Sequence, residues 1–345
     1  METFENIFNK EDLLCSYNFA RSSDIVYSEV VLREQFQELN IKDPLIIYED
    51  SDFIFYKLNE FELKENNIIF CNLYMIDSLF RLLKNETSFK NIKLITSQSD
   101  NSIDKKLFMT KPTCISEWYS TNVAYSNDKL IPVPLGLAND HPKNLKYEHF
   151  LETKGSQTKK ELAYMNFEKN TNFYKRNKIL NKLRPKDWIH TEESLISLED
   201  YLLKLKSYAF IISPPGNGID THRVWEAIYA GSHPVVEKNL SMNVFSEFPI
   251  IFVDHLSKAK FEQVKSLKKN LNNFNNEILK INYWMEKINK NRLDDTISKL
   301  IIRDEVESIN KALQNYKKNI RSEQRLKKYK TIFRRVYSLI FKLSF

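Results

Sequence analysis

The pattern of apolar and polar positions divides the chain into two stretches in which short apolar runs alternate with amphipathic segments. In the first half, apolar runs of strand length predict β-strands, and helical spacing at residues 29–39 and 74–84 predicts helices. Strands that alternate with helices favour a parallel sheet covered on both faces. The strands are predicted at DPLIIYED, DFIFYKL, NNIIFCNLY, NIKLITSQ and KLIPVPLGL.

The second half repeats this alternation with sharper boundaries. Its elements follow in βαβαβαββ order, which right-handed crossovers would arrange as one doubly wound sheet. Ser197 and Asp200 form a capping box at the start of one helix, and Gly231 ends another. Residues 257–319, rich in Lys and Asn, predict mainly long helices. The strands are predicted at KKELAYMNF, DWIHTEE, AFIISPPGNG, SHPVVEKN and PIIFVDHL, and the helices at NFYKRNKILNKL, SLEDYLLKLKSY and DTHRVWEAIYAG.

The length of 345 residues suits two domains, at roughly 100 to 200 residues per domain. A polar stretch at residues 146–160 predicts the linker between them. We therefore expect an α/β protein with a first domain at residues 1–145, a second at 161–300 and C-terminal helices at 301–345. Two doubly wound domains that face each other would hold a ligand between the carboxyl ends of their strands.

The formal net charge of +7 is confined to the end of the chain. Residues 321–345 hold eight basic residues and one acidic residue, so the remaining body is neutral. Apolar residues alternate with these bases at helical spacing, which is typical of a helix that lies on an anionic membrane surface. The same pattern fits a last helix packed on the body, and both interpretations stay open. No nucleic-acid-binding motif accompanies the tail, so we expect no nucleic-acid partner.

Cysteine usage and the apolar runs bear on the compartment. Cys15, Cys71 and Cys114 are widely spaced, without a CxxC pair, which argues against a disulfide framework or a zinc site. No uninterrupted apolar run reaches the roughly 18 residues needed to cross a bilayer. The first residues include acids and lack an apolar core, so we expect no signal peptide. We expect a cytoplasmic protein, peripheral at the inner face of the plasma membrane if the tail binds lipid.

The segment SPPGNGIDTHRVWEAIYAGSHPVV carries the most specific chemistry. It predicts a strand, a loop with Gly216 and Gly218, and a helix whose first turn holds His222 and Arg223. The free amides at a helix start bind phosphate, and a bound diphosphate would explain two cations where the helix dipole disfavours them. Glu226, one turn deeper, is placed to accept hydrogen bonds from ribose hydroxyls. An ordinary strand-loop-helix unit with a solvated helix start remains the alternative.

The string GIDTHRVWEAIYAGSHPVV, after a strand and a Pro-Gly loop, resembles the C-terminal signature of the exostosin-like glycosyltransferases. It is more distantly similar to fucosyltransferases of the GT-B fold. The close match covers about 25 residues, and the order of elements agrees over about 130 residues. The resemblance implies a GT-B fold of two Rossmann-like domains, a nucleotide-sugar donor held by the second domain, and transfer without a metal or other cofactor. By position, it implies that the diphosphate faces Gly216, Gly218, Thr221, His222 and Arg223, and the ribose Glu226.

The first loop of the second domain supplies a further basic candidate. In GT-B enzymes this loop borders the ligand site, and a basic residue there commonly meets the donor phosphates. We select Arg176 for this role, with a solvated helix face as the alternative. The polar residues that the loop and the following helix carry are Asn166, Thr171, Asn172, Lys175 and Arg176.

A catalytic base for inverting transfer must come from the acceptor side. We select Asp100, which follows a strand in a polar loop, although each such acid also suits a helix cap or turn. The position eight residues before Glu226 is Gly218, so the paired carboxylates of many retaining GT-B enzymes are missing, which favours inversion. Other candidates for the base are Asp104, Glu117, Asp140, His141 and His233.

These observations predict a glycosyltransferase that moves a sugar from a nucleotide-sugar donor to a glycan or lipid-linked acceptor in surface polysaccharide synthesis. Two alternatives stay open. One is a sugar-nucleotide epimerase or hydrolase of the same fold. The other is a non-catalytic nucleotide- or glycan-binding protein at the membrane.

Overall fold

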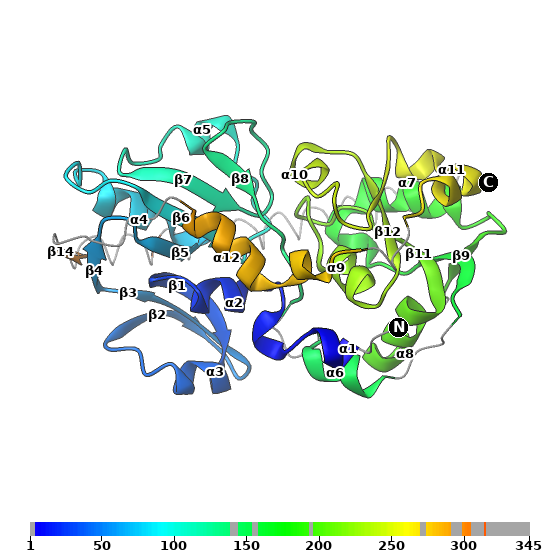
Figure 1. Ribbon diagram of the computed structural model, residues 1–345, viewed down its shortest axis with the longest axis horizontal. Coiled ribbons are helices and arrows are strands. Elements are labelled where there is room, and N and C mark those ends of the chain that lie inside the picture. Colours follow the sequence, from blue (N-terminus) through cyan, green and yellow to red (C-terminus); the bar gives the residue numbers. More distant parts are fainter. Residues whose placement is uncertain are drawn as a thin grey trace.

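Two β-sheets, each flanked by helices, form the framework of the protein (Figure 1). The structure, a computed structural model, describes residues 4–138, 144–153, 158–192, 196–269, 274–290, 299–304 and 314. The two sheets lie side by side along the long axis of the molecule, the first built from the first half of the chain and the second from the second half (Figure 1).

The first sheet has seven strands in the order β2-β3-β1-β5-β6-β7-β8. From β1 to β8 all neighbouring strands are parallel, whereas β3 pairs antiparallel with both β1 and β2 at one edge. The strands are β1 (Ile25–Leu32), β2 (Pro44–Glu49), β3 (Phe53–Leu58), β5 (Ile68–Asn72), β6 (Ile92–Ser97), β7 (Ile115–Ser120) and β8 (Leu130–Pro132). The predicted parallel sheet is therefore present, with an antiparallel extension.

The second sheet has five strands in the order β10-β9-β11-β12-β13, and every pair is parallel. Its strands are β9 (Lys160–Met165), β10 (Ile189–Thr191), β11 (Tyr208–Ile212), β12 (His233–Glu237) and β13 (Ile251–Val253). The chain moves from β9 outward to β10 and then returns to the other side of β9 as β11, which creates a topological switch point between β9 and β11. The doubly wound sheet predicted for this half is confirmed.

Helices cover both sheets. Ser197 caps α8 as predicted, since its hydroxyl accepts a hydrogen bond from the Asp200 amide at 3.0 Å. Gly231 follows α9 with a φ of 70°, the left-handed conformation that ends many helices. The helices are α1 (Phe4–Ile7), α2 (Ser16–Arg21), α3 (Arg33–Glu38), α4 (Ile76–Leu83), α5 (Lys105–Phe108), α6 (Tyr147–Glu152), α7 (Phe173–Leu183), α8 (Leu198–Ser207), α9 (His222–Tyr229), α10 (Leu240–Asn243), α11 (Phe261–Ser266) and α12 (Ile281–Asn289).

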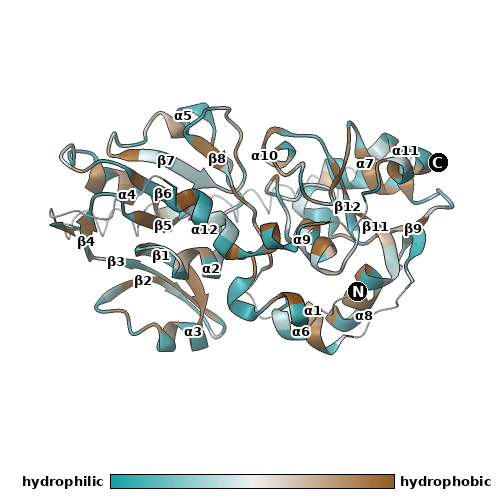
Figure 2. Ribbon diagram, viewed as in Figure 1, coloured by the Kyte–Doolittle hydropathy of each residue, from teal (hydrophilic) through white to brown (hydrophobic). Residues whose placement is uncertain are grey.

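Alternate side chains of the central strands enter different hydrophobic clusters, so each sheet is buried on both faces. In β5, Phe70 belongs to a cluster shared by the two halves, whereas Ile69 packs in a cluster of the first half alone. In β11, Ile211 joins the shared cluster and Phe210 packs in a cluster of the second half. Figure 2 shows hydrophobic residues along these central strands. A common apolar core thus joins the two halves.

Three predictions about local structure were wrong. Residues 29–32 belong to strand β1 rather than to a helix, and only Arg33–Glu38 form the helix α3. The helices described after residue 257 are short, with six residues in α11 and nine in α12. Residues 299–303, placed among C-terminal helices, form strand β14. The stretch 146–160 contains the short helix α6, and its role as a linker stays a prediction. The basic tail at 321–345 lies outside the described residues.

The end of the described chain returns to the first half. Strand β14 (Lys299–Arg303) pairs antiparallel with β4 (Glu60–Lys64), and α12 lies across the middle of the molecule in Figure 1. The ammonium of Lys93 on β6 donates to the carbonyl of Ile288 on α12. Just after β14, the Asp304 carboxylate forms an ion pair with Lys57, and both side chains are fully buried. Residues 299–304 are therefore part of the first half.

The Lys57–Asp304 pair yields a test of this arrangement. Replacing Asp304→Ala leaves a buried ammonium without its partner, so we expect the free energy of unfolding to fall by roughly 3–5 kcal/mol. Arg303→Ala is the matched control, because Arg303 and Glu60 form an exposed pair that contributes about 0–1 kcal/mol. Urea-induced unfolding followed by circular dichroism measures both. Equal small effects would show that β14 is not anchored by this pair.

Candidate functional site

The loop at residues 213–221, here called the glycine loop, connects the carboxyl end of β11 to the start of α9. β11 is the middle strand of its sheet and one of the two strands at the switch point. The loop after β9, the other strand at this point, contains Phe167 and Thr171. Ligands of doubly wound sheets bind at the carboxyl ends of the strands beside such a point. The fold therefore brings the two predicted loops to the expected edge.

Neighbouring side chains lie so close to Gly216 and Gly218 that a larger residue would collide with them. A β-carbon at Gly216 would lie 3.1 Å from Nη2 of Arg176, and one at Gly218 would lie 2.9 Å from Nδ2 of Asn122. Either contact is tighter than ordinary packing. Protein contacts are thus sufficient to explain both glycines, and their predicted role at a diphosphate stays a prediction.

The start of α9 has unsatisfied hydrogen-bonding groups. Thr221 is the N-cap residue, but its side chain does not cap the helix, and the first turn contains no acid. The Thr221 Oγ1 and the Arg223 Nε are buried and have no hydrogen-bond partner among the described residues. The first amides of a helix also carry a partial positive charge. Together the two unpartnered groups and this charge suit an anion.

Two guanidinium groups meet around one aromatic ring. The Arg176 Cζ lies 5.4 Å from the centre of the Phe167 ring, and the Arg223 Cζ lies 6.0 Å from it. Burial and, to a smaller extent, the neighbouring charge of Arg223 together lower the pKa of Arg176 to about 10. Because the two cations repel each other, a bound polyanion would relieve their repulsion.

Arg176 also holds the glycine loop in place. Its guanidinium donates to the carbonyls of Pro215 at 3.0 Å, Pro214 at 3.3 Å and Glu168 at 2.6 Å. The residue is only 4% exposed, so the alternative of a solvated helix face is wrong. The Asn172 amide adds a hydrogen bond to the Gly216 carbonyl at 3.0 Å.

Asp220 ties the glycine loop to the first half. Its carboxylate accepts from the amide of Leu135 at 3.0 Å and from the indole Nε1 of Trp225 at 2.9 Å. Burial raises its pKa to about 6, although these hydrogen bonds act in the opposite direction. Beside it, the His222 Nδ1 lies 2.7 Å from the Gly136 carbonyl. His222 therefore contacts the backbone of the first half, while its predicted contact with a diphosphate stays a prediction.

Asn122, which follows β7, forms a second tie. Its Oδ1 accepts from the amides of Ile219 at 2.7 Å and Asp220 at 2.9 Å, and its Nδ2 donates to the Ser99 carbonyl at 3.0 Å. Sequence reasoning singled out neither Asn122 nor Asp220. A single polar residue after a strand carries no recognisable pattern, although DTHR in the matched string did include Asp220.

Glu226 lies one turn inside α9 and is buried. Its Oε2 accepts a hydrogen bond from the Tyr201 hydroxyl of α8 at 2.9 Å. Burial and the nearby carboxylate raise the pKa of Tyr201 well above its usual value, so the phenol remains a donor. The predicted contact of Glu226 with a ribose stays a prediction.

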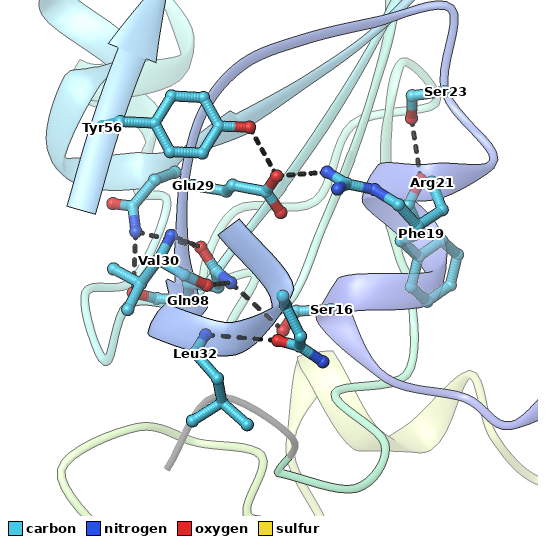
Figure 3. Close-up of polar contacts among 11 residues, drawn as sticks. Ser16, Phe19, Arg21, Ser23, Glu29, Val30, Leu32, Tyr56 and Gln98 are labelled. Carbon is cyan, nitrogen blue, oxygen red and sulfur yellow. Dashed lines mark hydrogen bonds and ion pairs between the residues drawn. The ribbon is translucent and has the colours of Figure 1, made fainter. Parts of the chain in front are cut away.

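Asp100 reaches the glycine loop from the first half. Its Oδ2 accepts from the Nδ2 of Asn217 at 3.2 Å, and both residues are exposed. Asp100 belongs to a short loop after β6, residues 98–101, here called the acid loop. Gln98 anchors this loop, because its amide pairs with both the N–H and the carbonyl of Val30 at 2.8 and 2.7 Å (Figure 3). The structure thus brings the predicted base beside the predicted phosphate loop.

The other candidate acids and histidines have structural partners or lie outside the described residues. Asp104 caps α5, and Glu117 pairs with Lys93. The His233 Nε2 lies 2.8 Å from the Lys269 carbonyl. Asp140 and His141 fall outside the described part of the chain. Of the polar residues near Arg176, Lys175 pairs with Glu237, Thr171 donates to the Glu168 carbonyl, and Asn166 donates to the Tyr164 hydroxyl.

A separate polar cluster lies inside the first half (Figure 3). Glu29 on β1 accepts from the Tyr56 hydroxyl at 2.6 Å and pairs with Arg21, while its other oxygen is buried without a partner. Burial raises the pKa of Glu29. Among the described residues, this carboxylate makes no contact with the glycine loop, so we assign it no part in the candidate site.

No protein-family model matches the chain, and no curated protein matches it in sequence. The resemblance to exostosin-like glycosyltransferases therefore rests on the residues themselves. Within the described residues, no group of three or more His, Cys, Asp or Glu side chains is arranged to hold a metal ion. The three cysteines are buried thiols and are not joined in disulfides. No helix in the described ranges has the length and apolar character that a membrane span requires.

Because Asp220 connects the two halves and has a shifted pKa, we expect the stability of the protein to depend on pH through this residue. Its pKa is raised in the folded protein, so the folded state binds this proton more tightly than the unfolded chain does. The stabilisation by protonated Asp220 is complete only below the unfolded pKa of 3.8 and is lost as the pH rises through the folded value of about 6. Relative to Asp220→Asn, the wild type should therefore lose roughly 3 kcal/mol of unfolding free energy between pH 3 and pH 7.

Urea-induced unfolding at several pH values measures this difference. Asp104→Asn controls for the same exchange at the exposed start of α5. A difference between wild type and Asp220→Asn that does not change with pH would mean that Asp220 is hydrated rather than buried.

Proposed function

We propose that the protein is a glycosyltransferase that binds the diphosphate of a nucleotide sugar at the start of α9. The observation that carries this proposal is the uncapped helix start, where Thr221 Oγ1 and Arg223 Nε are buried and find no partner in the described parts of the chain. An unpaired buried donor is costly, and a phosphate oxygen would satisfy several such donors at once. The helix dipole and the two repelling guanidiniums add to the preference for an anion.

The proposed donor site uses the second half of the chain. Arg223, the first amides of α9 and the remaining donor capacity of Arg176 bind the diphosphate, and Glu226 accepts from the ribose hydroxyls. Tyr201 fixes the orientation of that carboxylate. When the bond between the sugar and the diphosphate breaks, its electron pair leaves with the diphosphate, and these cations stabilise the charge that develops.

Asp100 is the proposed general base. The acceptor hydroxyl attacks the anomeric carbon and transfers its proton to this carboxylate, with inversion at that carbon. Its contact with Asn217 supports this role, because it brings an acid of the first half to the loop proposed to hold the donor. The first half would then bind the acceptor, a glycan or lipid-linked glycan of a surface polysaccharide, in the GT-B arrangement. The proposal needs no divalent cation, so turnover should persist in EDTA.

Nucleotide binding tests the proposal directly. We expect Arg223→Ala to weaken the affinity for the best-bound diphosphate among UDP, GDP, ADP and CDP by roughly 10- to 100-fold, since a charge-assisted hydrogen bond contributes about 1.5–3 kcal/mol. Isothermal titration calorimetry measures the dissociation constant. Arg81→Ala, on the exposed surface of α4, is the matched control and should bind like the wild type.

Unchanged affinity in Arg223→Ala would remove the assigned diphosphate site. Turnover of a nucleotide sugar without an acceptor would instead favour the epimerase or hydrolase interpretation. Nucleotide binding without turnover for any acceptor would favour a non-catalytic binding protein.

The basic tail is proposed to attach the enzyme to an anionic membrane from the cytoplasmic side. We expect a chain that ends at residue 320 to lose sedimentation with vesicles of phosphatidylglycerol and phosphatidylcholine, while the full chain sediments. Binding of the full chain should weaken as salt rises, because the attraction is electrostatic. Equal sedimentation of the two chains would mean that the tail does not anchor the protein.

A further inference from the structure

Asn122 occupies the junction between the acid loop and the glycine loop. It is 1% exposed, and its carboxamide bonds to both loops at once. The oxygen takes the amides of Ile219 and Asp220, and the nitrogen donates to the carbonyl of Ser99, the residue before Asp100. Apart from the direct bond between Asn217 and Asp100, no other side chain in the described part of the chain forms hydrogen bonds to both loops.

The backbone at Asn122 is specialised for this position. Its φ of 55° lies in the left-handed region, which asparagine adopts more readily than most residues do. The backbone of the same residue is fixed as well, because its carbonyl accepts from the Ile103 amide at 3.1 Å. The next residue, Val123, donates through its amide to the Ser241 hydroxyl of α10 at 3.3 Å. The carboxamide is thus held from both halves.

Gly218 is shaped to receive this side chain. A β-carbon at Gly218 would lie 2.9 Å from Nδ2 and 3.0 Å from Oδ1 of Asn122, which is too close for ordinary packing. The carboxamide therefore lies directly against the glycine loop. The Asn122 carboxamide thus occupies the space that a side chain at residue 218 would need, so this contact requires glycine at residue 218.

We propose that Asn122 is a positioning residue that fixes the glycine loop relative to Asp100, so that the donor diphosphate and the catalytic base have a set separation. This inference rests on the proposed function and adds to it the element that joins its two halves. Asn122 acts through the backbone of both loops and does not itself touch the substrate. Each loop is anchored elsewhere by its own half, the acid loop by Gln98 and the glycine loop by Arg176. Asn122 connects these two anchored units.

The test removes the carboxamide without straining the backbone. Asn122→Gly is suitable because glycine accepts a positive φ. The matched control is Asn40→Gly, which makes the same exchange at an exposed residue with a φ of 47°. Gly218→Ala disrupts the same contact from the glycine loop, because the added β-carbon displaces the Asn122 carboxamide. Thermal unfolding of each variant confirms that it is folded before the other measurements.

Hydrogen–deuterium exchange measures whether Asn122 orders the two loops, and it requires no ligand. We expect Asn122→Gly and Gly218→Ala to raise the exchange rate at least tenfold in both the 98–101 and 216–221 segments. The Asn40→Gly variant should leave both segments unchanged. Unchanged exchange in either segment of Asn122→Gly would overturn the proposal.

Binding and turnover read the functional consequence. We expect Asn122→Gly to raise the dissociation constant of the best-bound nucleoside diphosphate by less than about fivefold but to lower kcat at saturating donor by more than tenfold. A large fall in kcat with a small change in affinity is expected if the distance between base and donor is no longer fixed. General destabilisation would not produce this difference in a folded variant. Unchanged kcat would overturn the proposal. If the wild type binds no nucleoside diphosphate, the proposed function fails, and the exchange measurement alone decides whether Asn122 joins the loops.

Discussion

A carboxylate removed from water must have its charge compensated by donors, and Asp220 takes its donors from both halves of the molecule. Its oxygens bind the Leu135 amide on one side and the Trp225 indole on the other. This requirement fixes where the chain enters α9. Asp220 lies directly before the N-cap residue Thr221, and the first turn of α9 itself contains no acid. The burial of one acid thus fixes the position of the helix start on which the candidate site depends.

The same segment combines rigidity with unpaired polar atoms. Protein groups hold the backbone of the glycine loop on several sides, through Arg176, Asn172 and Asn122. In contrast, Thr221 Oγ1 and Arg223 Nε have no partner. A loop that is already ordered does not lose further conformational entropy on binding, so a ligand there gains more from each hydrogen bond. Order around a group of free donors is the arrangement expected of a binding site rather than of a packing contact.

The sequence predicted the second sheet well because its strands are continuous apolar runs separated by amphipathic helices with clear caps, such as Ser197 and Gly231. It failed at β1, where the polar residues Ser28 and Glu29 interrupt the apolar pattern and are nevertheless buried through tertiary contacts. Strand β14 was missed because its partner β4 is more than 200 residues away and no local pattern specifies such a pairing. The contact of Asp100 with Asn217 and the ties made by Asn122 depend on the approach of the two halves, which one-dimensional spacing does not encode.

The return of residues 299–304 to the first half has a consequence for biosynthesis. Lys57 is buried against a carboxylate that is synthesised almost 250 residues later. Until that segment leaves the ribosome, the ammonium lacks its carboxylate partner and β4 lacks its partner strand. The first half therefore cannot reach its final form in order of synthesis, although domains commonly do so. Synthesis must pass residue 304 before this half matures, even though most of its residues are made first.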